Sequence, residues 1–224
     1  MPVDFLTEAQ EKNFGRYAGE PTAAQLTKYF HLDESDHHLI QQRRGEHNKL
    51  GFAAQLCTVR FLGTFLPNPI DVPRGAAAYL AAQLGLDPTA ISAYMDREPT
   101  HREHAGEIQS IFGYTDFGQQ PEHWRLTRWL YERAWLTAER PSVLFDLATT
   151  RLLENKILLP GVTTLARLVA SIRDRASNRL WSLLSALPSV AQTKQLEHLL
   201  KVEVGTRQTM LDRLRQGPTR YSAP

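Results

Sequence analysis

The sequence predicts an all-α protein of two small multi-helix domains, each with a helix-turn-helix-like unit. Apolar residues recur at helical spacing in nearly every segment, and no segment shows sustained alternation of apolar and polar residues. No Asn-Gly or Asp-Gly hairpin turn occurs, and Pro, Gly and Asp divide the chain into short helical pieces. A chain of 224 residues is long enough to give each domain a core of its own.

The first domain is expected to be built around a central helix through residues 50–61. Shorter helices are expected before it, over residues 6–11, 21–30 and 32–44. Between Leu50 and Phe61 the apolar side chains cover most of the helix circumference, which predicts burial on all sides. We expect Gly51 to admit a close neighbour. Cys57 is expected to be a small core residue, because no His/Asp arrangement around it indicates a nucleophile.

Three further short helices are expected after a linker at residues 67–73, over residues 75–84, 88–95 and about 100–112. They are predicted to form a helix-turn-helix-like unit whose third helix carries Thr100 and Arg102 as candidate DNA contacts. Residues 112–121 combine glycines, aromatic residues and a proline, which is typical of a domain boundary. The first domain is therefore predicted over residues 1–118 and the second over residues 119–205.

The second domain is expected to open with an amphipathic helix over residues 124–138. Pro141 begins the next helix, which runs to about residue 156 and should bury Leu144, Leu147, Ala148 and Leu152. The Pro160-Gly161 turn then leads into a third helix over residues 163–181. Two short helices are expected over residues 192–200 and 209–214. Residues 206–224 are expected to be a linker, because they end without a cap or closing helix and the chain looks cut from something longer.

The helix over residues 163–181 has two contrasting faces. One face is apolar and should pack on the core: Leu165, Leu168, Val169, Ile172, Ala176 and Leu180. The other is polar: Thr164, Arg167, Ser171, Asp174, Arg175 and Asn178. We expect the hydroxyls of Thr163 and Thr164 to cap the helix start. A core-anchored helix that follows a helix and a turn fits the major groove of DNA, so the candidate contacts are Thr163, Thr164, Arg167, Ser171, Arg175 and Asn178. The alternative is an ordinary solvated surface helix.

A basic and polar cluster precedes the central helix of the first domain. It consists of Arg43, Arg44, His47, Asn48 and Lys49. A helix start offers free N–H groups and the positive end of the helix dipole, so this cluster is a candidate phosphate site. The alternative is that some of these arginines pair with Glu46, Asp36 or another acid at the edge of the core.

Charge is distributed unevenly along the chain. Residues 1–118 carry 10 Lys and Arg against 15 Asp and Glu, whereas residues 119–224 carry 16 against 9. Of those 16 basic residues 13 are arginines, which suit groove and phosphate contacts better than lysines do. The second half therefore suits a polyanionic partner, although a solvated arginine-rich surface would give the same composition.

Enzymatic chemistry is not indicated by any motif. The chain has no glycine-rich phosphate loop and no nucleophile-elbow serine. His101 and His104 share a helix face, but the other ligands and spacings of a zinc site are missing, so no metal and no cofactor is expected. A single cysteine fits a reducing cytoplasm, and we find neither a membrane-spanning run nor a signal peptide.

Short motifs run in order through both predicted domains. They are residues 29–34 (YFHLDE), 44–56 (RGEHNKLGFAAQL), 60–65 (RFLGTF), 97–104 (REPTHREH), 140–141 (RP), 159–169 (LPGVTTLARLV) and 215–218 (RQGP). In content and order they resemble the N-terminal region of replicative transposases of the Tn-three family. The resemblance covers essentially the whole chain.

The resemblance implies helical subdomains that bind double-stranded DNA at the terminal inverted repeats of a transposon, in the bacterial cytoplasm. Catalysis in that family belongs to a separate C-terminal RNase-H-like domain with an Asp-Asp-Glu metal site. Neither activity nor magnesium is therefore carried over to this chain, and a dimer would form through the missing C-terminal part. Two alternatives stay open: a stand-alone helix-turn-helix transcription regulator, and a helical protein-interaction or assembly module.

Overall fold

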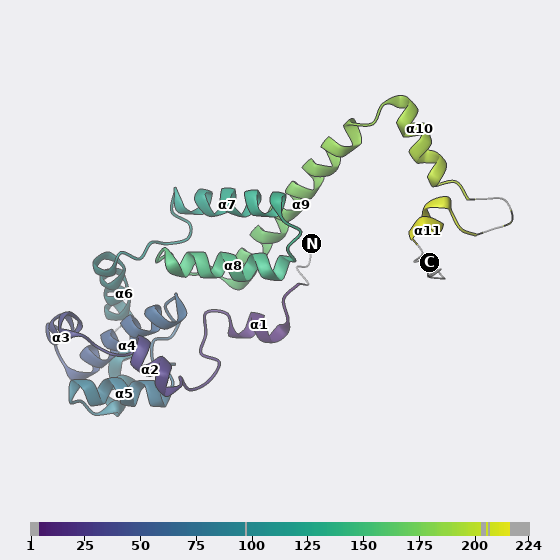
Figure 1. The fold of residues 1–224 in the computed structure, drawn as a ribbon. Helices are drawn as coiled ribbons and strands as arrows, with labels where there is room; N and C mark the ends of the chain where they lie inside the picture. The colour runs from purple at the N-terminus through teal and green to yellow at the C-terminus, as the bar shows by residue number, and fades with distance from the viewer. Residues whose placement is uncertain (1–4, 97, 203–204, 206, 216–224) are drawn as a thin grey trace, which may run out of the picture. The chain divides into compact units, whose positions relative to one another are not determined.

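The structure, a computed structural model, describes residues 5–96, 98–202, 205 and 207–215. Every regular element in these residues is a helix (Figure 1). The β contacts among them are two isolated bridges, Thr115 with Ile157 and Val202 with Thr209. The all-α prediction is confirmed. Arg97, which begins the motif at 97–104, and residues 206 and 216–224 of the expected linker lie outside the described residues. Across the described ranges no helix is both long and apolar enough to span a membrane.

The chain divides into two compact units, Met1–Asp174 and Arg175–Pro224. The first unit contains α1 (Glu8–Asn13), α2 (Ala23–Tyr29), α3 (Glu34–Gln41), α4 (Glu46–Leu62), α5 (Arg74–Leu84), the 3-10 helix η1 (Pro88–Asp96), α6 (Glu98–Phe112), α7 (Glu122–Leu136) and α8 (Pro141–Glu154). Helix α9 (Val162–Ala186) begins in the first unit, and its later part belongs to the second with α10 (Val190–Leu199) and α11 (Met210–Arg215). The division at residues 118 and 205 stays a prediction.

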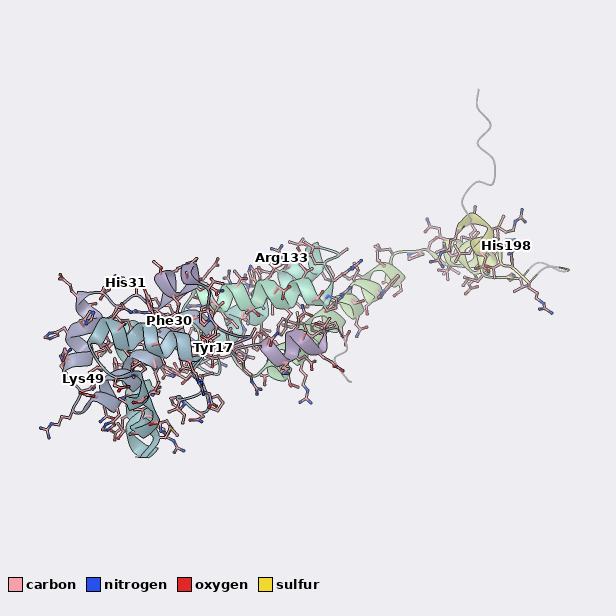
Figure 2. All side chains as sticks on the ribbon, turned by 90° about the horizontal axis from the view of Figure 1, so that it is seen from below. Tyr17, Phe30, His31, Lys49, Arg133 and His198 are labelled. Carbon is pink, nitrogen blue, oxygen red and sulfur yellow. The ribbon has the colours of Figure 1, made fainter. Side chains whose placement is uncertain are left out.

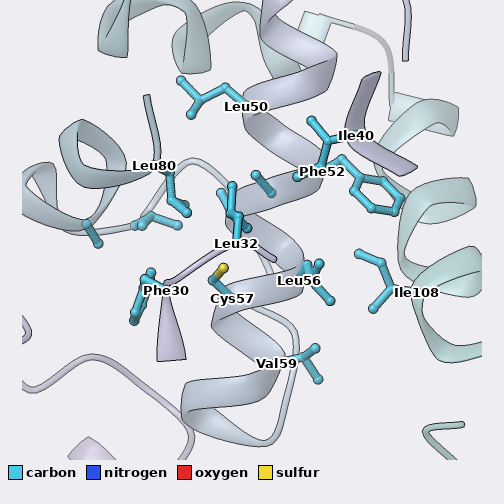
Figure 3. Packing of buried hydrophobic residues seen from close by; sticks show 14 of the residues in the cluster. Phe30, Leu32, Ile40, Leu50, Phe52, Leu56, Cys57, Val59, Leu80 and Ile108 are labelled. Atoms are coloured by element: carbon cyan, nitrogen blue, oxygen red, sulfur yellow. The ribbon is translucent and has the colours of Figure 1, made fainter. Parts of the chain in front are cut away.

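Helix α4 is the centre of the first hydrophobic core. All ten residues from Leu50 to Val59 are buried, as their apolar circumference predicted. Helices α2, α3, α5, α6 and η1 pack against it, and Figure 3 shows its side chains reaching Ile40, Leu80 and Ile108 on different sides. Cys57 is fully buried among them, as expected.

Gly51 lets η1 approach α4 closely. A methyl group built on Gly51 would overlap the ring of Tyr94, which is 1% exposed. The prediction that this glycine admits a close neighbour is confirmed. Residues 88–95, expected to be helical, form η1 as a 3-10 helix.

The second core lies between α7, α8 and the first half of α9. Leu144, Ala148 and Leu152 are buried as predicted, and Leu147 is half-buried. On α9 the residues Leu165, Val169, Ile172 and Ala176 are buried and Leu168 is half-buried. The expected burial of Leu180 is wrong, because the buried residues of α9 end at Ala176 and Leu180 is 41% exposed.

Candidate nucleic-acid interface

The N-terminus of α4 carries backbone donors without partners. Gly45 is its N-cap residue and provides no side-chain cap. Its carbonyl accepts from the N–H of Lys49 over 3.2 Å. Within the described part of the chain, the N–H groups of Glu46, His47 and Asn48 have no hydrogen-bond acceptor. These groups and the helix dipole make this end of a 17-residue helix attractive to an anion.

A hollow of about 480 Å³ lies at this helix end. It is lined by Arg44, Gly45, His47, Asn48, Ala93, Tyr94 and Thr100. Four of these, Arg44, His47, Asn48 and Thr100, are candidates from the sequence, and Thr100 comes from α6 rather than α4. The fold therefore brings together candidates from two distant stretches.

Arg43 is held by the protein itself. Its guanidinium makes a bidentate ion pair with Glu107 on α6, with 2.8 Å from Nη1 to Oε2. It also lies 4.5 Å above the ring of Phe52, and its side chain is 15% exposed. The sequence left open that some arginines of this cluster pair with an acid at the edge of the core, and Arg43 does so. Asp36 instead pairs with Arg60, over two contacts of 2.7 Å.

The remaining members of the cluster face the solvent to different degrees. Asn48 donates its amide to the carbonyl of Arg44 over 2.8 Å, and Lys49, labelled in Figure 2, donates to Gln41 Oε1 over 2.6 Å. Arg44 is exposed and His47 is half-buried, and neither side chain has a hydrogen-bond or ion-pair partner among the residues that the structure describes. Arg44 is therefore the cation of this cluster that is most available to a ligand.

Tyr94, which lines the hollow, belongs to a buried polar network. Gln55 Nε2 donates to Tyr94 Oη over 2.6 Å, and Tyr94 Oη lies 2.8 Å from His104 Nδ1. Burial, and next the charge of Arg43, lower the pKa of His104 to about 4, so its ring is neutral near pH 7. Burial raises the pKa of Tyr94. The sequence did not identify Tyr94 as a lining residue. Gly51 predicted that some side chain packs closely against α4, but it did not predict which one.

The first half of α9 presents the predicted polar face. Thr163, Thr164, Arg167 and Ser171 are all exposed, opposite the buried Leu165 and Val169. The helix begins at Val162, so both threonines lie inside its first turn, and the expectation that their hydroxyls cap the helix start is wrong. Among the described residues, Arg167 has no ion-pair or hydrogen-bond partner. This surface offers hydroxyls and one unpaired guanidinium on a rigid support.

The other candidates lie elsewhere on the chain. Arg175 and Asn178 are exposed, but they belong to the second unit. Arg102 is exposed on α6, four residues after Glu98, where that helix begins. No group of three or more His, Cys, Asp or Glu side chains that could hold a metal ion is found in the described ranges.

Comparisons with known proteins match the chain to one family and several relatives. Residues 5–172 match the family described as "Domain of unknown function (DUF4158)". The chain is 51% identical over 225 residues to the transposase for transposon gamma-delta of Escherichia coli (strain K12), covering 100% of this chain and 22% of that protein. It is 34% identical over 198 residues to the transposase for transposon Tn3926 of Escherichia coli (88% and 20%). It is 32% identical over 219 residues to the transposase for transposon Tn501 of Pseudomonas aeruginosa (97% and 22%). The chain thus spans about a fifth of the length of these relatives.

Proposed function

Since the chain belongs to the family described as "Domain of unknown function (DUF4158)", and its relatives are transposases, we propose that it binds double-stranded DNA at the terminal inverted repeats of a transposon. In this role it is the N-terminal DNA-binding region of a transposase of the Tn-three family. The bond-breaking chemistry and any dimer contact belong to another part of the protein. The chain acts on DNA in the bacterial cytoplasm and needs no cofactor of its own.

The polar face of α9 carries this proposal. An α-helix fits the major groove when one face is anchored in a core and the other presents donors to base edges. Arg167 is exposed and unpaired among the described residues, and Thr163, Thr164 and Ser171 accompany it on the exposed surface of the helix. A guanidinium that no carboxylate of the described residues neutralises is available for a guanine edge or a phosphate. Arg175 and Asn178, which belong to the second unit, are proposed as separate DNA contacts.

The N-terminus of α4 supplies a phosphate site in this proposal. Phosphate contacts fix the position of a protein on a duplex without reading its sequence. The free N–H groups of the first turn, with Arg44, His47 and Thr100 around the hollow, suit a phosphate oxygen. Lys49 and Arg102 are proposed to contribute charge at its edge. Arg43 contributes mainly by shaping the site, because its guanidinium is engaged by Glu107.

An electrophoretic mobility shift assay tests the proposed function. The chain should bind a transposon-end duplex more tightly than a scrambled duplex of equal length. Arg167→Ala should weaken binding to the end duplex by about 1–3 kcal/mol, with little loss on scrambled DNA, if Arg167 reads a base. Arg173→Ala is the matched control, because Arg173 lies about 120° around the same helix. An equal loss on both duplexes would assign Arg167 to the phosphate contacts, and equal wild-type binding to both would contradict the proposal.

A protein-interaction role is the second candidate function, and one observation favours it. In the second unit, the large apolar side chains Leu180, Trp181, Leu183, Leu184, Leu187 and Val190 are all more than 40% exposed. Apolar patches of this kind often mark contact surfaces. Analytical ultracentrifugation of the DNA-free chain, together with the mobility shift assay, separates the two roles. Self-association without a preference for end DNA would favour the interaction module.

A further inference from the structure

The short segment between α8 and α9 joins the two hydrophobic cores of the first unit. We call residues 156–159 the bridging segment. Ile157 and Leu159 are buried in the second core, whereas Leu158, between them, is buried in the first core. Successive side chains of an extended chain point to opposite sides, so three consecutive residues can serve two cores. The segment is therefore an anchor and not a flexible linker.

Backbone hydrogen bonds fix the bridging segment to the ends of α6 and α4. Thr115 N–H donates to the carbonyl of Lys156 over 3.0 Å, and Leu158 N–H donates back to Thr115 over 2.9 Å. Lys156 Nζ donates to the carbonyl of Phe112 over 3.1 Å. Leu159 N–H donates to the carbonyl of Gly63, the C-cap residue of α4, over 2.9 Å.

Gly63 makes the last of these contacts sterically feasible. Its φ of 73° lies in the left-handed region, which disfavours residues with a Cβ. A methyl group built there would overlap Leu153 Cδ2 and would lie 3.2 Å from Leu159 Cγ. The end of α4 and the chain that leads into α9 thus meet at a position that fits only glycine.

Helix α4 connects the two proposed DNA contacts. Its N-terminus forms the hollow beside Arg44, and its C-cap binds Leu159, two residues before the turn at Gly161. A helix of 17 residues is roughly 25 Å long. That length is somewhat less than one turn of B-DNA, which is about 34 Å. The two proposed contacts are therefore joined by a helix and its hydrogen-bonded cap.

We propose that the bridging segment holds two DNA-contacting surfaces at one fixed spacing, with Leu158 as the positioning residue. One surface is the hollow at the N-terminus of α4, and the other is the polar face of α9 from Thr163 to Ser171. The chain then reads its DNA with two surfaces as one rigid body, and a change in the distance between the two DNA subsites abolishes simultaneous contact. This inference rests on the proposed function. It adds a spacing requirement that the proposed function does not contain.

An insertion scan tests this proposal on the full chain. Ethylation interference first locates the phosphate whose signal depends on Arg44, and methylation interference locates the base whose signal depends on Arg167. About five base pairs, half a turn of B-DNA, are then inserted between them. We expect the wild-type chain to lose roughly a hundredfold in affinity for the lengthened duplex, because only one surface can bind.

Leu158→Ala should relax this requirement. It should bind the native duplex more weakly than the wild type and lose less than about threefold on insertion, since the surfaces are then uncoupled. Leu80→Ala is the matched control, because it truncates a leucine of the same core on α5, away from the segment. The control should keep the full insertion penalty. Leu158→Val is a milder truncation for use if Leu158→Ala does not fold.

Three results have distinct meanings. Wild-type binding that tolerates the insertion would overturn the fixed spacing while leaving end recognition intact. A folded Leu158 variant that keeps the full penalty would overturn the role of Leu158. Loss of preference for end DNA over scrambled DNA would instead contradict the proposed function.

Discussion

Gly51 packs directly against Tyr94, which is the close neighbour that the sequence predicted for this glycine without identifying it. The Tyr94 ring occupies the space above Gly51. Its hydroxyl accepts a hydrogen bond from Gln55 and forms another with His104, and these two bonds hold the ring in place. Gly51→Ala should therefore lower the free energy of unfolding by about 1–3 kcal/mol through overpacking. Urea denaturation followed by circular dichroism measures the change.

Gly106 provides the control for this substitution. It also lies inside a helix, α6, but a methyl group built there meets no atom within 4 Å. Gly106→Ala should raise stability by about 0.5–1 kcal/mol, because alanine has the higher helix propensity. Equal effects of the two substitutions would show that propensity, and not the Tyr94 ring, determines the outcome at Gly51.

His104 should make stability depend on pH. Its folded pKa of about 4 lies below its ordinary value of 6.5, because burial and Arg43 disfavour the charged ring and the carboxylate of Glu107 offsets this only in part. Between these values the unfolded chain binds a proton that the folded chain does not bind. The contribution of His104 is thus complete above about pH 6.5 and is lost as the pH falls toward 4.

Urea denaturation at several pH values between about 7 and 4.5 measures this dependence. His104→Gln should be less stable at pH 7 and should show a flatter profile. His198→Gln, a change at an exposed position in α10, should keep the wild-type profile. An unchanged slope in His104→Gln would assign the acid sensitivity to other groups.

At the scale of elements, one buried ion pair joins α3 to α4. Asp36 is fully buried and binds Arg60 through both carboxylate oxygens. Asp36→Asn keeps the size of the side chain but leaves the Arg60 guanidinium without its counter-charge. We expect a loss of about 2–4 kcal/mol in the free energy of unfolding.

The more exposed pair of Arg125 and Glu122 on α7 is the comparison for this prediction. The Arg125 side chain is 62% exposed, so solvent screens the attraction. Glu122→Gln should cost less than about 1 kcal/mol. Similar losses in the two variants, measured by chemical denaturation, would contradict the importance of burial.

The elements that the sequence predicted well are those whose pattern is complete within one segment. The apolar circumference of α4 predicted its burial, and the two faces of α9 appear as expected up to Ala176. Leu180 continues the same period and yet is exposed. Periodicity identifies a face that can be buried, but only the neighbouring helices determine where burial stops.

At the scale of the whole molecule, the candidate site depends on contacts between distant segments. Thr100 reaches the hollow of Arg44 and His47 only because η1 and α6 pack against α4. Glu107, the partner of Arg43, lies 64 positions further along the chain. The sequence anticipated that an acid at the core edge could pair with these arginines, but no local pattern distinguishes Glu107 from the other acids of the first domain.

The salt dependence of DNA affinity tests how many positive charges of the molecule contact phosphates. The net charge is only +2, so a uniform attraction to DNA would be weak. The proposed contacts instead concentrate cations at α4 and α9. If about four of them each neutralise a phosphate, the slope of log affinity against log salt should be about −3.6, a loss of roughly 150-fold between about 50 and about 200 mM salt. Fluorescence anisotropy on end DNA measures the slope.

Single substitutions then distinguish phosphate contacts from base contacts. Arg44→Ala should make the slope about 0.9 units shallower if Arg44 binds a phosphate at the α4 N-terminus. Arg167→Ala should leave the slope nearly unchanged and remove preference for end DNA if Arg167 reads a base. Arg43→Lys should change the slope least, because Glu107 already engages that charge. A flat salt response of the wild-type chain would contradict phosphate binding at either surface, since each neutralised phosphate releases counterions whatever the sequence of the duplex.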